Sequence, residues 1–238
     1  MGQNIYGVDI GTSNFKMCCK DKDKIINEKN IIAIANKKDI LAFGDEAYEM
    51  YEKAPEHIEV SFPVKFGVIA DIENMQTLLL RFFNKMNDDK KFTGNTDFYI
   101  AVPTDVTEVE KRAFYELVAD SKVKAKNIYI VDKPVADAIG AGLDVTKSKG
   151  IMIVNIGAET TEISVLSLGG IVISKSVKIG GNKLDDSIIS AVRKVYNLII
   201  GSKTAEAFKK KNSAVPYRQK KLLRRALDVT CFQDCLSA

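Results

Sequence analysis

IYGVDIGTSNFKMCC, residues 5–19, and IMIVNIGAETTEISV, residues 151–165, are the two stretches that decide the fold. Laid over each other, they share Ile, Val, Ile and Gly in the same order, and Asp9 lies opposite Asn155. Each begins with an apolar run, breaks at a glycine and resumes as a second strand-like run, which predicts a β-hairpin. Two unrelated hairpins can share such common residues. The acid or amide two residues before the glycine in both favours a duplicated unit.

Strand-like and helix-like segments alternate along the rest of the chain. Helices are predicted from an apolar stripe over residues 71–87, a capping box at Thr107 and Glu110, Pro134 in a first turn and an N-cap at Asn182. One face of the last helix is expected to carry Leu184, Ile188, Val192, Val195 and Ile199. Further strands are predicted at 25–34, 40–43, 98–102, 128–131 and 171–179. This alternation predicts an α/β fold with a partly parallel sheet.

The composition is that of a folded globular protein. The 238 residues are 46% hydrophobic and 28% charged. No stretch approaches the roughly 18 apolar residues that cross a bilayer, and the N-terminus lacks the basic and apolar regions of a signal peptide. A transmembrane or secreted protein is therefore not expected.

Positive charge is concentrated in the C-terminal part. The formal net charge is +4, and residues 201–238 carry nine Lys/Arg against three Asp/Glu. A short basic run without interleaved aromatic residues is typical of a solvated segment. No nucleic-acid partner is expected.

Cysteine and histidine form no pattern of a metal or catalytic site. Cys18 and Cys19 are adjacent, Cys231 and Cys235 are far away, and His57 is the single histidine. These numbers and spacings argue against a disulfide scaffold, a zinc ribbon and a Ser-His triad. Reduced cysteines in a cytoplasmic protein are the simpler interpretation.

The paired turns carry the chemistry. Gly11, Thr12, Ser13 and Asn14 offer successive backbone N–H groups and hydroxyls, which suit a polyphosphate. Asp9, at the end of the preceding strand, is a candidate to hold Mg²⁺ through water, because that ion keeps most of its waters. One such turn is weak evidence, and the duplicate favours nucleotide binding.

These residues resemble the phosphate loops of the actin, hexokinase and heat-shock-chaperone ATPase superfamily, with residues 9–14 as the first loop and 155–161 as the second. Within it, the chain most resembles MreB, the bacterial actin, over residues 1 to about 209. The resemblance is carried by PTDVTEVEKRA at 103–113, IGAGL at 139–143, SLGGI at 167–171, Gly180-Gly181 followed by Asp185, and RKVYNL at 193–198.

The resemblance implies an actin-like ATPase fold, with two lobes around a cleft that holds ATP and Mg²⁺. It implies the following nucleotide-binding residues: Gly11, Thr12, Ser13, Asn14, Asn155, Gly157, Ala158, Glu159, Thr160, Gly180, Gly181, Lys183, Glu206 and Lys209. For the last two of these, an i to i+3 pair on a solvated helix is the open alternative.

The resemblance also implies self-association into filaments in the cytoplasm, at the inner face of the membrane, where they guide cell-wall synthesis and cell shape. The family contacts the membrane through an apolar loop or an N-terminal helix. Here the corresponding loop, 88–96, offers only Phe92, and the basic C-terminal segment adds electrostatic attraction to anionic lipid. We expect weak, salt-sensitive association with membranes.

Three residues depart from the family pattern. Asn155 stands where the family has Asp, and Glu159 where it has glycine, so triphosphate binding should be weakened. Lys133 occupies the position of the family's water-activating Glu, before Pro134, and Asp132 is a poor substitute for that base. The catalytic residue is therefore unknown, and little or no ATPase activity is expected.

The resemblance divides the chain into four parts: a first-lobe core (1–32 and 71–142), a small first-lobe subdomain (33–70), a partial second-lobe core (143–180) and a partial small second-lobe subdomain with a divergent basic tail (181–238). The second lobe is expected to be incomplete, as in a C-terminally truncated or frameshifted product. A small-molecule kinase or exopolyphosphatase of the same superfamily, and a nonfunctional fragment, stay open as alternatives.

Overall fold

A five-stranded sheet organises the first half of the protein. The computed structural model describes residues 4–20, 22–36, 38–88 and 96–212. The sheet has the order β10-β9-β1-β2-β3. β1 is parallel to β9, which is parallel to β10, while β1, β2 and β3 form an antiparallel meander. The predicted partly parallel sheet is confirmed. Its strands are β1 (Asn4–Ile10), β2 (Asn14–Cys19), β3 (Lys22–Lys29), β9 (Thr96–Val102) and β10 (Asn127–Asp132).

Two amphipathic helices, α2 (Ile72–Met86) and α3 (Glu108–Ala119), supply the main core against this sheet. The apolar stripe of α2 is buried as its spacing predicts, and the Asp71 side chain accepts a hydrogen bond from the Asn74 amide at its start. The capping box that opens α3 is also confirmed, since the Glu110 amide donates to Thr107 and the Thr107 amide to the Glu110 carboxylate.

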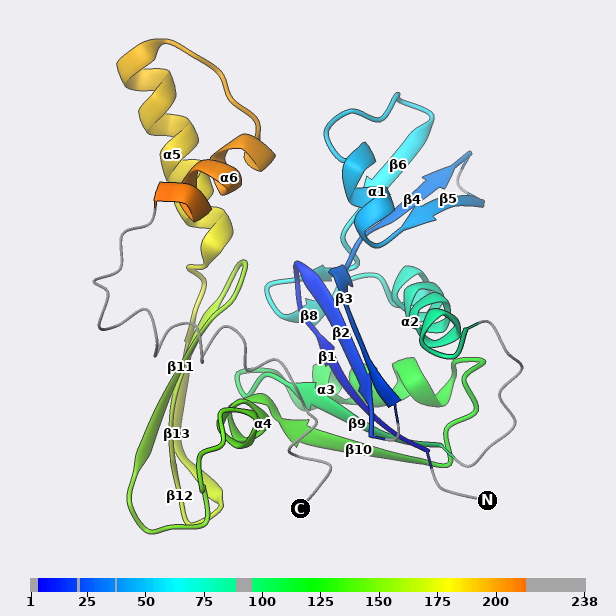
Figure 1. The fold of residues 1–238 in the computed structure, drawn as a ribbon, viewed down its shortest axis with the longest axis vertical. Helices are drawn as coiled ribbons and strands as arrows, with labels where there is room; N and C mark the ends of the chain where they lie inside the picture. The colour runs from blue at the N-terminus through cyan, green and yellow to red at the C-terminus, as the bar shows by residue number, and fades with distance from the viewer. Residues whose placement is uncertain (1–3, 21, 37, 89–95, 213–238) are drawn as a thin grey trace.

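A second, small sheet lies next to the end of the central sheet at which β3 leads into this second sheet (Figure 1). It has the order β5-β4-β6 and packs against the short helix α1 around Ala47. The predicted run over 25–34 is split into β3 and β4 at Asn30, which is buried and donates from its side-chain Nδ2 to the Gly11 carbonyl and from its backbone amide to the Ser13 carbonyl. These elements are β4 (Ile32–Ala35), β5 (Asp39–Phe43), α1 (Asp45–Met50) and β6 (Ile58–Ser61), followed by the hairpin of β7 (Val64–Lys65) and β8 (Val68–Ile69).

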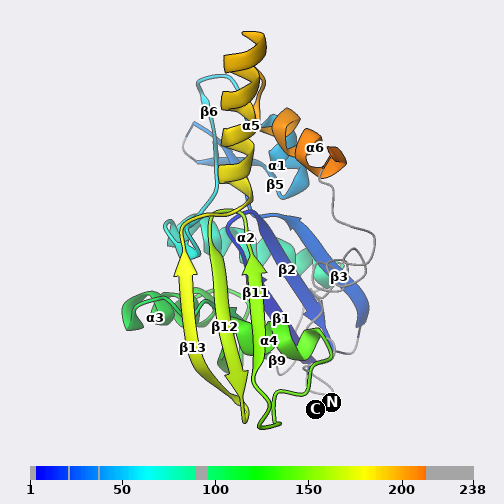
Figure 2. The same ribbon diagram turned by 90° about the vertical axis from the view of Figure 1, so that its left-hand side faces the viewer.

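The second predicted hairpin belongs to a separate three-stranded antiparallel sheet, β11-β12-β13. Helix α4 packs on one face of this sheet, where its Ala138 lies in one buried cluster with Leu166 of the sheet. The helix lies between this sheet and the central one (Figures 1 and 2). The opposite face is apolar and exposed among the described residues, with Met152 67% exposed and Ile163 40%. The bounds are α4 (Lys133–Gly140), β11 (Ile151–Ile156), β12 (Thr161–Ser167) and β13 (Gly170–Val177).

Two helices, α5 (Gly181–Tyr196) and α6 (Ser202–Asn212), end the described part of the chain. The N-cap of α5 is Gly180, so the prediction that Asn182 caps this helix was wrong. Asn182 lies inside the first turn, and its backbone amide donates to the Ala158 carbonyl. Ile199 lies outside the helix, because Asn197 adopts a left-handed conformation, φ 52°, and ends it.

No helix among the described residues is long and apolar enough to cross a membrane. The residues on which the expected membrane contact depends, Phe92 and most of the basic segment, lie outside the described residues, as do Cys231 and Cys235. The division into four parts stays a prediction.

The core predicts a large effect of truncating Phe82. Its ring is fully buried and stacks on Phe15 with centroids 4.5 Å apart. We expect Phe82→Ala to lower the free energy of unfolding by about 3 to 5 kcal/mol in urea denaturation. The control Val109→Ala removes only the γ-methyl groups of a residue that is 79% exposed and should change the free energy of unfolding by less than about 0.5 kcal/mol. Equal effects of the two variants would contradict this assignment of the core.

Candidate nucleotide and phosphate site

The two repeated turns have the same geometry. The Gly11 amide donates to the Asn14 carbonyl at 3.0 Å, and the Gly157 amide donates to the Thr160 carbonyl at 2.8 Å. A Cβ at Gly11 would lie 2.8 Å from the Asn14 oxygen, and one at Gly157 would lie 3.0 Å from the Thr160 oxygen. Glycine is therefore needed for the same steric reason in both turns, which supports the duplication.

Both turns present backbone donors. Within the described part of the chain, no acceptor is found for the amides of Thr12 and Ser13 in the first turn, or of Ala158 and Glu159 in the second. Consecutive amides of this kind form concavities that bind anions. The two turns are thus chemically suited to phosphate groups.

Asp9 lies beside the first turn, close to the ends of the parallel strands β1, β9 and β10. Asp9 is 8% exposed, and its carboxylate lies between two ammonium groups. Lys16 donates to Oδ2 at 3.2 Å, and Lys133, the first residue of α4, donates to Oδ1. Burial raises the pKa of Asp9, but the two lysines outweigh it and lower the pKa from 3.8 to about 2. Asp9 is therefore ionised and fully paired at neutral pH.

Lys133 is protonated in this arrangement. Burial lowers its pKa, and the carboxylates of Asp9 and Asp137 outweigh this effect and raise it. A protonated amine with a raised pKa cannot take a proton from water at neutral pH. Asp132, the residue before it, serves as the N-cap of α4 and makes no side-chain capping bond.

Asp137 extends this cluster toward the second turn. It lies one helical turn after Lys133, and Asn155 donates from its side-chain amide to Asp137 Oδ2 at 2.6 Å. Burial raises the pKa of Asp137, while Lys133 lowers it less. Asn155 thus connects β11 to α4 by its amide, and Asp9 and Asn155 are linked through Lys133 and Asp137.

The β7–β8 turn fastens the two repeated turns to each other. The Phe66 amide donates to Glu159 Oε2 at 2.6 Å, and the Gly67 amide donates to Thr12 Oγ1 at 3.1 Å. Glu159, the acidic departure in the second turn, therefore has a partner in this structure across a sequence separation of 93 residues.

The start of α5 packs on the second turn. The Gly181 amide donates to the Gly157 carbonyl at 2.9 Å, and the Asn182 amide donates to the Ala158 carbonyl at 2.7 Å. A Cβ at Gly180 would lie 2.6 Å from the Ala158 carbonyl. The structure thus brings Gly180 and Gly181 to the predicted site, and Lys183 is exposed at the same helix end.

Helix α6 places Lys209 against the start of α5. Its ammonium donates to the Gly181 carbonyl at 2.9 Å and to Asp185 Oδ2 at 2.7 Å. Glu206 does not pair with Lys209, so the alternative of an i to i+3 pair is wrong. Its Oε1 lies 2.8 Å from the Lys210 ammonium, one turn further along the helix.

Glu206 also reaches the small sheet. Its Oε2 accepts from the Tyr48 hydroxyl at 3.3 Å, and its Oε1 lies 3.8 Å from Lys29 Nζ. Burial and the Glu206 carboxylate raise the pKa of Tyr48 to about 12. Glu206 thus joins α6 to α1 and β3, and Lys209 joins α6 to the start of α5.

Lys16, Asp137 and Phe66 were missed by the sequence analysis. Lys16 could have been found, because a hairpin closed by residues 11–14 places it directly opposite Asp9 in the register. Asp137 could have been found from its spacing of one turn after Lys133 on a predicted helix. No local signal points to Phe66, which contributes a backbone amide.

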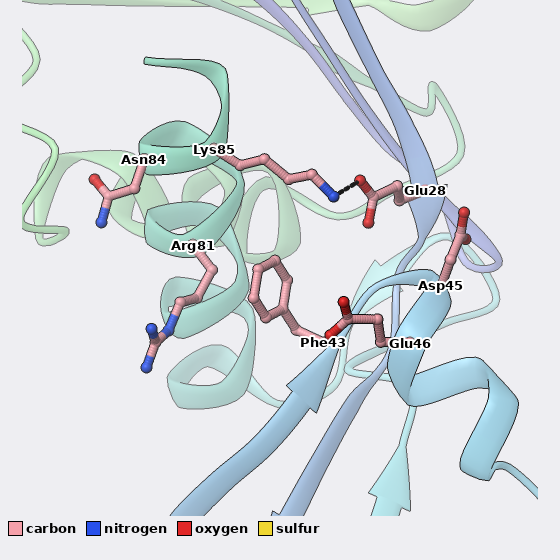
Figure 3. Close-up of a pocket in the computed structure, with 7 residues that line it drawn as sticks. All are labelled: Glu28, Phe43, Asp45, Glu46, Arg81, Asn84 and Lys85. Atoms are coloured by element: carbon pink, nitrogen blue, oxygen red, sulfur yellow. Dashed lines mark hydrogen bonds and ion pairs between the residues drawn. The ribbon is translucent and has the colours of Figure 1, made fainter. Parts of the chain in front are cut away.

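The described residues also carry a pocket of about 420 Å³ away from these turns, between α2, β3 and α1 (Figure 3). It contains none of the predicted site residues, and an ion pair of Lys85 with Glu28 spans it. No group of three or more His, Cys, Asp or Glu side chains among the described residues could hold a metal ion. Cys18 and Cys19 are buried, and neither forms a disulfide within the described part of the chain.

Comparison with known proteins identifies a family that includes both turns. The family model of the MreB/Mbl proteins matches residues 3–229. The chain belongs to the MreB/Mbl family. The cell shape-determining protein Mbl of Bacillus subtilis is 39% identical over 210 residues, which are 88% of this chain and 62% of that protein.

Solved structures give the same result for the fold. MreB5 of Spiroplasma citri bound to ADP is 34% identical to this chain with a TM-score of 0.81. The match covers 90% of this chain and 64% of MreB5. MreB5 bound to AMPPNP has a TM-score of 0.83, and the match covers 91% of this chain and 65% of MreB5. The actin-like fold is confirmed, and the chain spans less than two thirds of the length of these relatives. The comparisons give no support to the kinase or exopolyphosphatase alternative.

The pKa of Asp9 predicts a specific pH dependence of stability. Because its pKa is lower in the folded state, Asp9 contributes stability that is complete above about pH 4 and is lost as the pH falls toward about 2. We expect Asp9→Asn to lower the free energy of unfolding by about 2 to 3 kcal/mol at neutral pH, with the difference from wild type shrinking over that acid range. Urea denaturation at a series of pH values measures both.

The matched control is Asp88→Asn. Asp88 pairs with Lys24 at 2.5 Å, but its side chain is 66% exposed, so its loss should cost less than about 1 kcal/mol. A pH-independent difference between wild type and Asp9→Asn would contradict the ion-pair assignment.

Proposed function

We propose that the chain is a nucleotide-binding, actin-like cytoskeletal protein that self-associates into filaments. The observation that carries this proposal is the pair of turns closed by the same hydrogen bond, with their remaining amides open to phosphate. Membership of the MreB/Mbl family and the nucleotide-bound MreB5 structures support it.

The proposed nucleotide contacts are those predicted from the sequence. In the first turn they are the amides and hydroxyls of residues 11–14, and in the second those of residues 157–160 with Asn155. Gly180, Gly181 and Lys183 would lie near the nucleotide at the second turn, and Glu206 and Lys209 would lie toward the ribose and the adenine. Mg²⁺ bound through water at Asp9 remains the prediction of the sequence, and the two ammonium groups around Asp9 weigh against it.

The proposed setting is the cytoplasmic face of the membrane. Its basis is the family alone, in which cell-shape proteins are the relatives found. The partners would be further copies of this chain, the membrane surface and the cell-wall synthesis machinery.

Filament formation is tested by sedimentation and negative-stain electron microscopy of the purified protein with and without ATP. We expect ATP to raise the pelleted fraction and to give filaments. Gly11→Ala should abolish both effects, because the added Cβ would lie 2.8 Å from the Asn14 carbonyl and deform the turn. The control Gly150→Ala meets only ordinary contact, 3.7 Å from Val165. A response of Gly11→Ala equal to that of Gly150→Ala would contradict the proposal.

Hydrolysis is expected to be at or below a trace level. The position of the family's base holds Lys133, an ammonium paired with Asp9, and the loss of a positioned base costs about 10² to 10⁴ in rate. Phosphate release in the presence of Mg²⁺ is the measurement, and Lys133→Glu tests whether a carboxylate there raises it. Robust Mg²⁺-dependent turnover by the wild type, abolished by Asp9→Ala, would refute this expectation.

A further inference from the structure

The carboxylate best placed to hold a divalent cation is already occupied by positive charge. Both oxygens of Asp9 accept from ammonium groups, Oδ2 from Lys16 at 3.2 Å and Oδ1 from Lys133. A hydrated Mg²⁺ held through water by this carboxylate would lie within a few ångströms of both cations. The electrostatic repulsion at that separation opposes its binding.

The remaining groups of the cluster do not restore a cation site. Asp137 is a further carboxylate of the cluster, and it already interacts with Lys133 and accepts from Asn155 at 2.6 Å. The family pattern would place carboxylates at positions 133 and 155, where this chain has an ammonium and an amide. The residues present therefore do not fit Mg²⁺.

They do fit a phosphate. An ammonium has three N–H donors, and the contacts found for Lys16 and Lys133 each use one, on Asp9. Their side chains keep 23% and 17% of their surface exposed, so neither is sealed in the core. Lysine is a common phosphate ligand in proteins. The amides of Thr12 and Ser13, in the adjoining turn, point to the same class of ligand.

We propose that Lys16 and Lys133, held in place by Asp9, take the part of the divalent cation, so that this site binds the polyphosphate of a nucleotide free of metal. This rests on the proposed function that the turns bind a nucleotide. Asp9 then acts as a positioning residue: it fixes two ammonium groups from different elements, the strand β2 and the helix α4. The ligand is a nucleoside di- or triphosphate whose charge is balanced by the protein.

The test is calorimetric titration of the wild type with ATP, once with MgCl₂ and once with EDTA. We expect dissociation constants within about threefold of each other, which is a small difference on the scale of binding free energies. Lys133→Met should weaken binding in EDTA by about tenfold or more, as removal of a charge-assisted donor does. Lys133→Glu should make binding dependent on Mg²⁺. The control Lys122→Met alters an exposed lysine and should change nothing.

The outcomes separate the two proposals. If ATP binds in MgCl₂ but more than about tenfold more weakly in EDTA, the inference is overturned and the nucleotide-binding function stands. If ATP binds in neither buffer, both are overturned. The comparison of the two buffers uses the wild type and does not depend on whether a variant folds. If circular dichroism shows that Lys133→Met is unfolded, Lys16→Met replaces it, because Lys16 lies on an antiparallel hairpin and not at the start of a helix. Unchanged affinity in both folded variants also overturns the inference.

Discussion

The buried carboxylate of Asp9 is the constraint on which the rest of the site depends. An unpaired charge in this position would be expensive, because its lost hydration must be replaced by partners of opposite charge. Those partners come from two directions, Lys16 from the same hairpin and Lys133 from the first turn of α4. The Asp9 side chain thereby couples the register of the hairpin to the start of α4. Strand β11 is coupled to them as well, because Asn155 joins it to α4.

Hydrogen bonds join elements before α4 to elements after it, beside the apolar contact of α4 with the β11–β13 sheet. Glu159 accepts from Phe66, Glu206 accepts from Tyr48, and the Thr104 amide donates to Glu162 Oε1 at 3.0 Å. These bonds are polar, unlike the apolar contacts that hold α2 to the central sheet and α4 to β11–β13. The elements after α4 are therefore joined to the rest by the apolar contact at α4 and by polar contacts with the β7–β8 turn, α1 and Thr104.

Local features of the fold could be predicted from the sequence, and long-range ones could not. The stripe of α2, the capping box of α3 and both hairpins follow from spacing within a few residues, and all are present. The start of α5 was misplaced because it is decided by the second turn, whose Ala158 carbonyl takes the Asn182 amide. The bond of Glu159 to Phe66 joins segments 93 residues apart, and no periodicity encodes it.

The two departures from the family pattern that looked independent in the sequence are coupled through Asp137. A cation at the first residue of a helix is disfavoured by the helix dipole, so Lys133 needs nearby negative charge, which Asp9 and Asp137 supply. Asp137 in turn needs a donor on its other side, and the Asn155 amide provides it at 2.6 Å. An ionised aspartate at position 155 would only accept, and would place a third carboxylate beside Asp9 and Asp137. Asn155 is thus the residue that lets Asp137 serve Lys133, and the site changes its charge as a set.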